Sequence, residues 1–318
     1  MTLVERSTVL MGTELRAAVW APSRGAAINA IEAAFAHVKR ADRLLSTWHP
    51  SEITHLNNAA PDRPVRISPE LVRVLREVQH WVAATGGAFD PAIGALVDAW
   101  DLRGEGRRPE PAALNAALAA SGIKQFRLVG DSAAIRRSPR SWIDTGGFGK
   151  GWALRRVQAA LERHGVASGL INFGGQVMAL GRSRDAEHWT VAVANPSERQ
   201  CAVRALQLTD RSVATTAQSE RFVEVDGAML GHVLDPRTGR PVEPWGSVTV
   251  ISNDPMVADI LSTALFVMGP EQGAAWLDRH PSVAALWLIE REGGVQARWN
   301  AAMKAYLKPA EGKETCLQ

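Results

Sequence analysis

The order of strand-like and helical stretches constrains the fold of this chain more than any other feature. Helical periodicity dominates the first 120 residues, and short strand-like runs dominate from Phe126 onward. Two helical stretches interrupt these runs without strict alternation, which favours the α+β class over a doubly wound α/β sheet. We expect helices at Ala26–Leu45, Pro69–Ala84, Gly94–Trp100, Pro111–Ala120, Lys150–His164 and Val257–Met268. We expect strands at 7–20, Phe126–Val129, Gly169–Asn172, Trp189–Val193, Val203–Leu208, Phe222–Val225, Met229–Leu234 and Ser247–Ile251.

The composition is that of an ordinary globular protein. The chain has 318 residues, 46% of them hydrophobic and 22% charged, which permits a single α+β domain over residues 1–318. The net charge is +3, and no Lys/Arg block is long enough for a nucleic-acid footprint, so we expect no nucleic-acid partner. No run approaches the roughly 18 apolar residues that cross a bilayer, so we expect no stable membrane insertion.

The ends of the chain bear on its location. Charged residues interrupt any apolar signal-peptide region near the N-terminus, namely Glu5, Arg6, Glu14 and Arg16. We therefore expect a cytoplasmic protein from the sequence as it stands, with a periplasmic location as the alternative if a targeting segment has been removed. Cys201 and Cys316 are the only cysteines, and the second lies in a polar tail, so we expect no structural disulfide.

A glycine-rich turn follows a predicted strand end at Ile143. The stretch IDTGGFGKGWALRR contains four glycines that let the backbone approach a ligand, and a helix start after them offers free N–H groups to an anion. Lys150 lies at that helix start. The pattern is neither G-x-G-x-x-G nor a P-loop, because Gly follows the Lys. A tight strand-to-helix turn without a ligand explains the stretch equally well.

A lone histidine lies beside a stiff turn in the stretch GHVLDPRTGRP. Asp235, Pro236 and Gly239 specify the turn, and His232 lies on the predicted strand before it. An isolated histidine is more often structural than catalytic. A rigid scaffold next to it nevertheless suits general acid/base chemistry, so both interpretations remain open.

The stretch ADILSTALFVMG is predicted to be helical and carries three oxygen-bearing side chains. Asp259, Ser262 and Thr263 stand at positions i, i+3 and i+4 and so share one helix face. Carboxylate and hydroxyl oxygens are the ligands that Mg²⁺ prefers. In the structural alternative, the Asp caps the helix and the hydroxyls bond back to a carbonyl.

Two weaker candidates lie in the first third of the chain. Asp90 precedes Pro91 in GAFDP, where an N-cap is the favoured explanation. Trp48 could stack on a flat ring, although core packing is the commoner role of a Trp. His49 and His55 are six positions apart in a predicted loop, which is no metal-binding signature.

Taken in order, seven segments resemble the FAD:protein FMN transferases, the ApbE family. The segments are Met11-Gly12-Thr13, LLSTWHPSEITHLN, GAFDP, DTGGFGKGW, NFGG, GHVLDPRTGRP and the AD…ST helix. The resemblance implies an ApbE-like, T-fold-related architecture with a mixed β-sheet core and flanking helices. It also implies Mg²⁺-dependent cleavage of FAD, with FMN attached through its phosphate to a Ser or Thr of an acceptor flavoprotein and AMP released.

The resemblance assigns roles to individual residues. His232 matches the catalytic histidine. The metal ligands would be the Gly149 carbonyl and the side chains of Asp259, Ser262 and Thr263. Lys150 fits the usual form of the glycine turn. The flavin-adenine site would be lined by Met11, Trp48, Ala88, Phe89, Asp90, Trp152 and Val233.

Several positions depart from the family pattern. Arg155 stands where an acidic residue is usual, Gln176 where Asp is common, Thr216-Ala217 where Ser-Gly is usual, and Ala92 where Thr is usual. The guanidinium of Arg155 could contact a phosphate or a carboxylate of the acceptor. A Mg²⁺-dependent FAD pyrophosphatase and a non-catalytic flavin-binding protein are the alternatives. Neither the acceptor nor the oligomeric state is indicated by the sequence.

Overall fold

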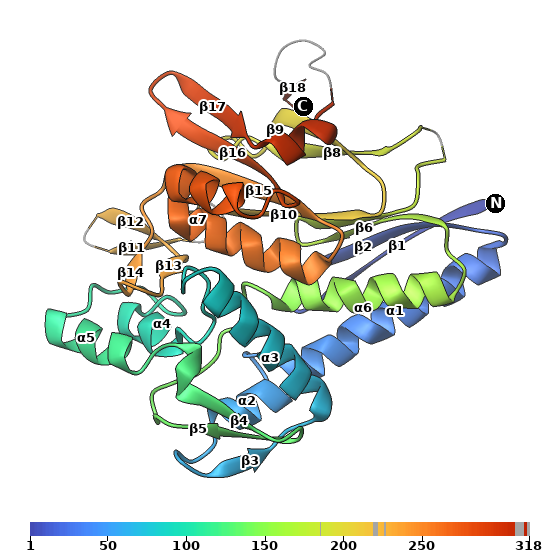
Figure 1. The fold of residues 1–318 in the computed structure, drawn as a ribbon. Coiled ribbons are helices and arrows are strands. Elements are labelled where there is room, and N and C mark those ends of the chain that lie inside the picture. The colour runs from blue at the N-terminus through green and yellow to red at the C-terminus, as the bar shows by residue number, and fades with distance from the viewer. Residues whose placement is uncertain (185, 219–221, 226, 309–314, 317–318) are drawn as a thin grey trace. The chain divides into compact units, whose positions relative to one another are not determined.

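The computed structural model of the chain divides into two compact units, each built from separate stretches of sequence. Unit 1 comprises Met1–Ala41, Phe148–Ala217 and Trp245–Gln318, and unit 2 comprises Asp42–Gly147 and Gln218–Pro244. Figure 1 shows the helices and strands of both units, coloured along the chain. The structure describes residues 1–184, 186–218, 222–225, 227–308 and 315–316.

The main sheet lies in unit 1. Among the described residues, eight strands form it in the order β1-β2-β6-β7-β10-β15-β16-β17. All neighbouring strands in it pair antiparallel, which confirms the α+β class. The strands are β1 (Thr2–Leu10), β2 (Thr13–Ala21), β6 (Ser168–Phe173), β7 (Gln176–Leu180), β10 (Arg211–Ala217), β15 (Gly246–Ser252), β16 (Ala284–Arg291) and β17 (Gly294–Trp299).

The first two strands form a hairpin where a single strand over residues 7–20 was predicted. Met11 and Gly12 make its two-residue turn, with φ angles of 49° and 76°. Two successive positive φ angles match the right-handed twist of the flanking strands. The prediction missed this turn because a Met is an uncommon residue in the left-handed region.

Two helices pack on one face of this sheet. Helix α6 (Gly149–Arg163) contacts β7 and α7, and α7 (Pro255–Asp278) contacts β10 and β15 (Figure 1). Helix α1 (Arg24–Leu45) begins in unit 1, where His37 hydrogen-bonds to Arg163 of α6 over 3.2 Å. A hydrogen bond from the Gly151 N–H to Asp259 places the start of α6 beside the first turns of α7.

Helix α7 is longer than predicted because it continues across a kink. Gly269 has φ 73° and ψ 174°, and Pro270 follows it without a backbone N–H to bond the preceding turn. The part before the kink carries the predicted oxygen ligands. No helix in the described part of the chain is both long and apolar enough to cross a membrane.

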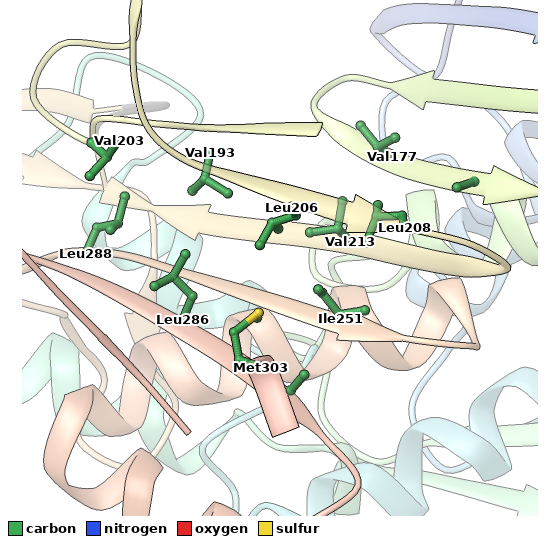
Figure 2. Packing of buried hydrophobic residues seen from close by; sticks show 12 residues of the cluster. Val177, Val193, Val203, Leu206, Leu208, Val213, Ile251, Leu286, Leu288 and Met303 are labelled. Atoms are coloured by element: carbon green, nitrogen blue, oxygen red, sulfur yellow. The ribbon is translucent and has the colours of Figure 1, made fainter. Parts of the chain in front are cut away.

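The other face of the sheet is covered by β8 (Trp189–Ala194), β9 (Cys201–Leu208) and the short helix η3 (Ala301–Ala305). Figure 2 shows their apolar side chains packed against those of the main sheet. Side chains along β10 point alternately to the two faces of the sheet. Val213 packs in this core, while Thr216 points to the opposite face and hydrogen-bonds to Ser262 of α7. Strand β18 (Thr315–Cys316) pairs with β9.

Cys201 corrects the expectation about cysteines. It is buried at the start of β9 and is disulfide-bonded, so the prediction that the chain has no disulfide is wrong. The backbone of Cys316 lies opposite Cys201 in the strand register, while its side chain lies outside the described part. A cysteine in a polar tail gave no sequence signal for this pairing.

Unit 2 is mainly helical, with short strands. Its apolar core gathers side chains of α4, α5 and the segment near Leu234. The helices are α2 (Glu52–Asn57), α3 (Pro69–Ala84), α4 (Gly94–Trp100), α5 (Pro111–Ala119) and η1 (Ile123–Gln125). The strands are β3 (Pro64–Arg66), β4 (Phe126–Val129), β5 (Ala133–Arg136), β11 (Phe222–Val225), β12 (Ala228–Gly231), β13 (Leu234–Asp235) and β14 (Arg240–Pro241).

Candidate functional site

The glycine-rich stretch leads into α6 as predicted, and within unit 1 a carboxylate from α7 meets the first turn of α6. The Asp259 Oδ2 atom accepts a hydrogen bond from the Gly151 N–H over 2.8 Å. Within the described residues, the N-cap residue Phe148 supplies no side-chain cap of its own. Asp259 therefore caps α6 from a neighbouring helix, which is where a negative charge is favoured.

Gly151 allows the two helices to touch. A Cβ atom at this position would lie 2.5 Å from the Pro255 carbonyl oxygen and 2.7 Å from the Asp259 Cβ. Any other residue would push α6 away from α7. Close packing of the two helices therefore requires glycine at this position. Gly149, which is buried, and Lys150, which is half-buried, lie in the same helical turn that Asp259 caps.

The hydroxyls of Ser262 and Thr263 on α7 share one acceptor but differ in their exposure and in their other contacts. Thr263 Oγ1 donates to the Asp259 carbonyl oxygen over 3.3 Å, and Ser262 Oγ donates to the same oxygen over 2.9 Å. Ser262 is only 1% exposed and also shares a 2.8 Å hydrogen bond with Thr216 of β10. Both hydroxyls therefore make the back-bonds of the structural alternative. Thr263, which is half-buried, keeps acceptor lone pairs for a cation, whereas Ser262 is held against the sheet.

The donor set fits Mg²⁺ in its chemistry. A buried carboxylate and a hydroxyl one helical turn apart are hard oxygen ligands. The described residues contain no group of three or more His, Cys, Asp or Glu side chains that could hold a metal ion. A site with one carboxylate suits Mg²⁺, because Mg²⁺ usually takes its remaining ligands from waters and substrate phosphates.

Gln176 joins β7 to the start of α7. Its Nε2 donates to the Pro255 carbonyl oxygen over 2.8 Å, and the side chain is 3% exposed. Its Oε1 has no hydrogen-bond partner among the described residues. The departure from the family pattern at this position therefore leaves one buried acceptor near the α6–α7 contact. Ala217 and Ala92, two further departures, are also buried.

Arg155 forms an ion pair within unit 1. Its guanidinium pairs bidentately with Asp254, with Nε–Oδ1 and Nη2–Oδ2 distances of 2.9 and 2.7 Å. Asp254 is the N-cap of α7, and its Oδ1 also accepts from the Met256 N–H. Arg155 therefore ties α6 to the N-cap of the helix that carries Asp259.

Arg155→Asp is expected to lower the melting temperature by about 2–6 °C. The change removes a bidentate pair contributing about 1 kcal/mol and sets two carboxylates against each other at the cap of α7. Arg155→Gln should fall between this variant and the parent. Arg76→Gln, which removes the exposed Arg76–Asp131 pair of unit 2, is the matched control and should change the melting temperature little. An unchanged melting temperature in Arg155→Asp would contradict the structural role.

In unit 2, the turn predicted beside His232 is present and stiff. Asp235 accepts from the backbone N–H groups of Arg237 and Gly239, and its carboxylate pairs with the Arg237 guanidinium at 2.9 Å. That hydrogen bond raises the pKa of Arg237. Gly239 has a φ angle of 70°, and its carbonyl accepts from the indole of Trp100 over 2.7 Å. His232 is half-buried between β12 and β13.

Trp48 is exposed but held in place. Its side chain is 69% exposed, so the structure excludes the core-packing alternative. The Arg103 guanidinium lies 4.4 Å from the Trp48 ring and 4.4 Å from the Trp142 ring. Arg103 is fixed in turn by hydrogen bonds to Thr47 and by an ion pair with Asp144 at 2.7 Å. A rigid, exposed indole is suited to stack on an aromatic ligand.

The carboxylate of Asp90 hydrogen-bonds to two backbone N–H groups. One carboxylate oxygen accepts from the Ala92 N–H and the other from the Ile123 N–H, both over 2.9 Å. Burial raises the pKa of Asp90, and these two hydrogen bonds oppose the rise. The N-cap role favoured from the sequence is wrong, because α4 begins at Gly94 and its N-cap is Ile93. Asp90 instead bonds the backbone of Ala92 and of Ile123, and its neighbours Ala88 and Phe89 are buried.

The remaining candidates are placed as follows. Met11 lies at the β1–β2 turn and is half-buried. Trp152 is buried on α6, with the Arg156 guanidinium 5.9 Å from its ring. Val233 is buried next to His232. Unit 1 thus gathers Gly149, Lys150, Asp259 and Thr263 at one helix contact, and unit 2 carries His232, Val233, Trp48 and the Ala88–Asp90 loop.

Sequence reasoning missed two residues that the structure brings into view. Arg103 supports Trp48, and Gln218 hydrogen-bonds to the backbone beside His232. A single Arg or Gln carries no spacing signal. Their roles depend on partners far away in the sequence.

Comparison with known proteins identifies the chain. Residues 11–287 match the model of the ApbE family. A Klebsiella pneumoniae protein named FAD:protein FMN transferase is 31% identical over 89% of this chain and 88% of its own length. A Vibrio cholerae protein of the same name is 29% identical over 84% of this chain and 80% of its own length.

Solved structures agree with these matches. Flavin transferase ApbE from Vibrio cholerae superimposes with a TM-score of 0.85 at 26% identity, covering 96% of this chain and 99% of that one. The ApbE protein from Thermotoga maritima gives 0.87 at 26% identity, covering 97% and 100%. The fold and these relatives place the chain among the transferases. It belongs to the ApbE family.

Proposed function

We propose that this chain cleaves FAD and attaches FMN, through its phosphate, to a Ser or Thr hydroxyl of an acceptor protein, releasing AMP. Relatives that match most of the chain carry the name FAD:protein FMN transferase. The observation that carries the proposal is the contact between α6 and α7. There a buried carboxylate, a hydroxyl and a glycine-rich helix start come together, as handling of a pyrophosphate requires.

Mg²⁺ would be held by the Asp259 carboxylate, the Thr263 hydroxyl and the Gly149 carbonyl, with Ser262 supporting Asp259 from the sheet side. When bound, it would supply charge neutralisation to the pyrophosphate and so favour departure of AMP. The ammonium of Lys150 would contribute a further positive charge at the helix start.

His232 would accept the proton of the acceptor's hydroxyl. The hydroxyl oxygen forms a bond to the phosphorus of the FMN half, the bond from that phosphorus to the oxygen of AMP breaks, and AMP leaves with the bonding electron pair. The exposed indole of Trp48, held by Arg103, would stack on a ring of FAD.

Incubation with FAD and Mg²⁺, with and without a candidate acceptor protein, tests the proposal. AMP is measured by chromatography, and covalent flavin by its fluorescence on the denatured acceptor. AMP and labelled acceptor formed together support the transferase. AMP formed equally without acceptor would make the protein a pyrophosphatase, and bound FAD without AMP would make it a flavin-binding protein.

A further inference from the structure

The side-chain amide of Gln218 hydrogen-bonds to the backbone of Val233, the residue that follows His232. Its Oε1 accepts from the Val233 N–H over 3.1 Å, and its Nε2 donates to the Val233 carbonyl over 3.2 Å. The same Nε2 donates to the Val242 carbonyl over 2.6 Å. The side chain is only 6% exposed, so an amide group otherwise costly to bury is satisfied by backbone groups alone.

The residue that precedes His232 also touches this amide. A Cβ atom at Gly231 would overlap the Oε1 and Cδ atoms of Gln218, so no larger residue fits there while the amide stays in place. Both neighbours of His232 in the chain are therefore set by one side chain. Since φ and ψ of His232 depend on the two peptide groups flanking it, Gln218 restricts where the imidazole can point.

The chain that follows His232 is also constrained by backbone hydrogen bonds. Val242 N–H donates to the Val233 carbonyl over 2.9 Å, and the Asp235 turn closes the loop between them. Gln218 joins the same two residues with side-chain hydrogen bonds beside this backbone bond. It extends the pairing of β13 and β14 by a side chain that mimics a backbone.

We infer that Gln218 is a positioning residue for His232: its amide fixes the histidine at the angle needed to take the proton of the incoming hydroxyl. The inference rests on the proposed role of His232 as general base. Catalytic geometry is sensitive to displacements of about 1 Å, which cost roughly 100-fold in rate.

Gln218→Met tests the inference, because Met has similar length and lacks the three hydrogen bonds. We expect the rate of flavin transfer at saturating FAD to fall about 10- to 100-fold, with the dissociation constant for FAD changed less than about twofold. Gln79→Met is the matched control. Gln79 donates from α3 of the same unit to the Phe126 carbonyl and should tolerate the change without loss of rate.

A second pair of variants separates positioning from general loss of fold. Gly231→Ala should slow transfer by displacing the Gln218 amide. In a Gln218→Ala background, the space is already open, so adding Gly231→Ala should cause little further loss. Rate losses that multiply would show that the two residues act independently and would overturn the inference.

The His232→Ala variant distinguishes failure of this inference from failure of the proposed function. If His232→Ala transfers at the normal rate, the general base is wrongly assigned. If His232→Ala loses transfer while Gln218→Met retains it, the histidine acts but Gln218 does not position it.

Discussion

Asp259→Ala is expected to lower the rate of flavin transfer by at least about a thousandfold. The variant loses the carboxylate proposed for the metal, and a bound cation contributes several kcal/mol to a phosphoryl-transfer transition state, each 1.4 kcal/mol being tenfold in rate. Titration with Mn²⁺, followed by thermal shift and by electron paramagnetic resonance, measures the loss of binding independently of turnover.

Asp259→Asn separates the metal from the helix cap. An Asn oxygen can still accept from the Gly151 N–H, so the start of α6 stays capped, whereas the negative charge is gone. We expect this variant to keep the melting temperature of the parent more closely than Asp259→Ala does, while losing Mn²⁺ affinity to a similar extent. Full activity of either variant in excess EDTA would exclude the metal site.

His232→Ala should reduce transfer by about 10²- to 10⁴-fold while leaving FAD affinity nearly unchanged. A general base acts mainly in the transition state, so its removal lowers the rate more than substrate binding. Single-turnover rates of AMP release and fluorescence titration with FAD measure the two effects separately.

His55→Ala is the control, since His55 is an exposed histidine on α2 of the same unit. It should transfer FMN at the parental rate. Added imidazole should partly restore His232→Ala by taking the proton from solution. Normal transfer by His232→Ala would show that the histidine is structural, and the stiff turn beside it would then need another explanation.

Local patterns predicted the long helices well and the strands less completely: the buried strand β15 was predicted, but two other buried strands were not. The helix at Pro69–Ala84 has the predicted bounds, because Ser68 caps it and Pro69 occupies its first turn. Strand β7 was missed, and β16 was missed as well. Both are buried along nearly their whole length, so their sequences lack the alternation of a half-exposed strand.

At the candidate site, too, local patterns predicted some features and missed others. The i, i+4 spacing correctly placed Asp259 and Thr263 on one helix face, since the Thr263 hydroxyl reaches the Asp259 carbonyl. The contact between Asp259 and Gly151 joins residues 108 positions apart, and no local pattern encodes it. The ion pair of Arg155 with Asp254 joins residues 99 positions apart and was likewise not predicted.

The division of the chain into units has a consequence for its synthesis. The sequence passes from one unit to the other after Ala41, Gly147, Ala217 and Pro244. On the ribosome, β10 therefore has to wait for the whole of residues 218–244 before its other neighbour, β15, emerges. A nascent or truncated chain that ends before α7 would carry His232 and the glycine turn without Asp259. Under the proposed function, the complete set of candidate site residues would therefore exist only after most of the chain has been made.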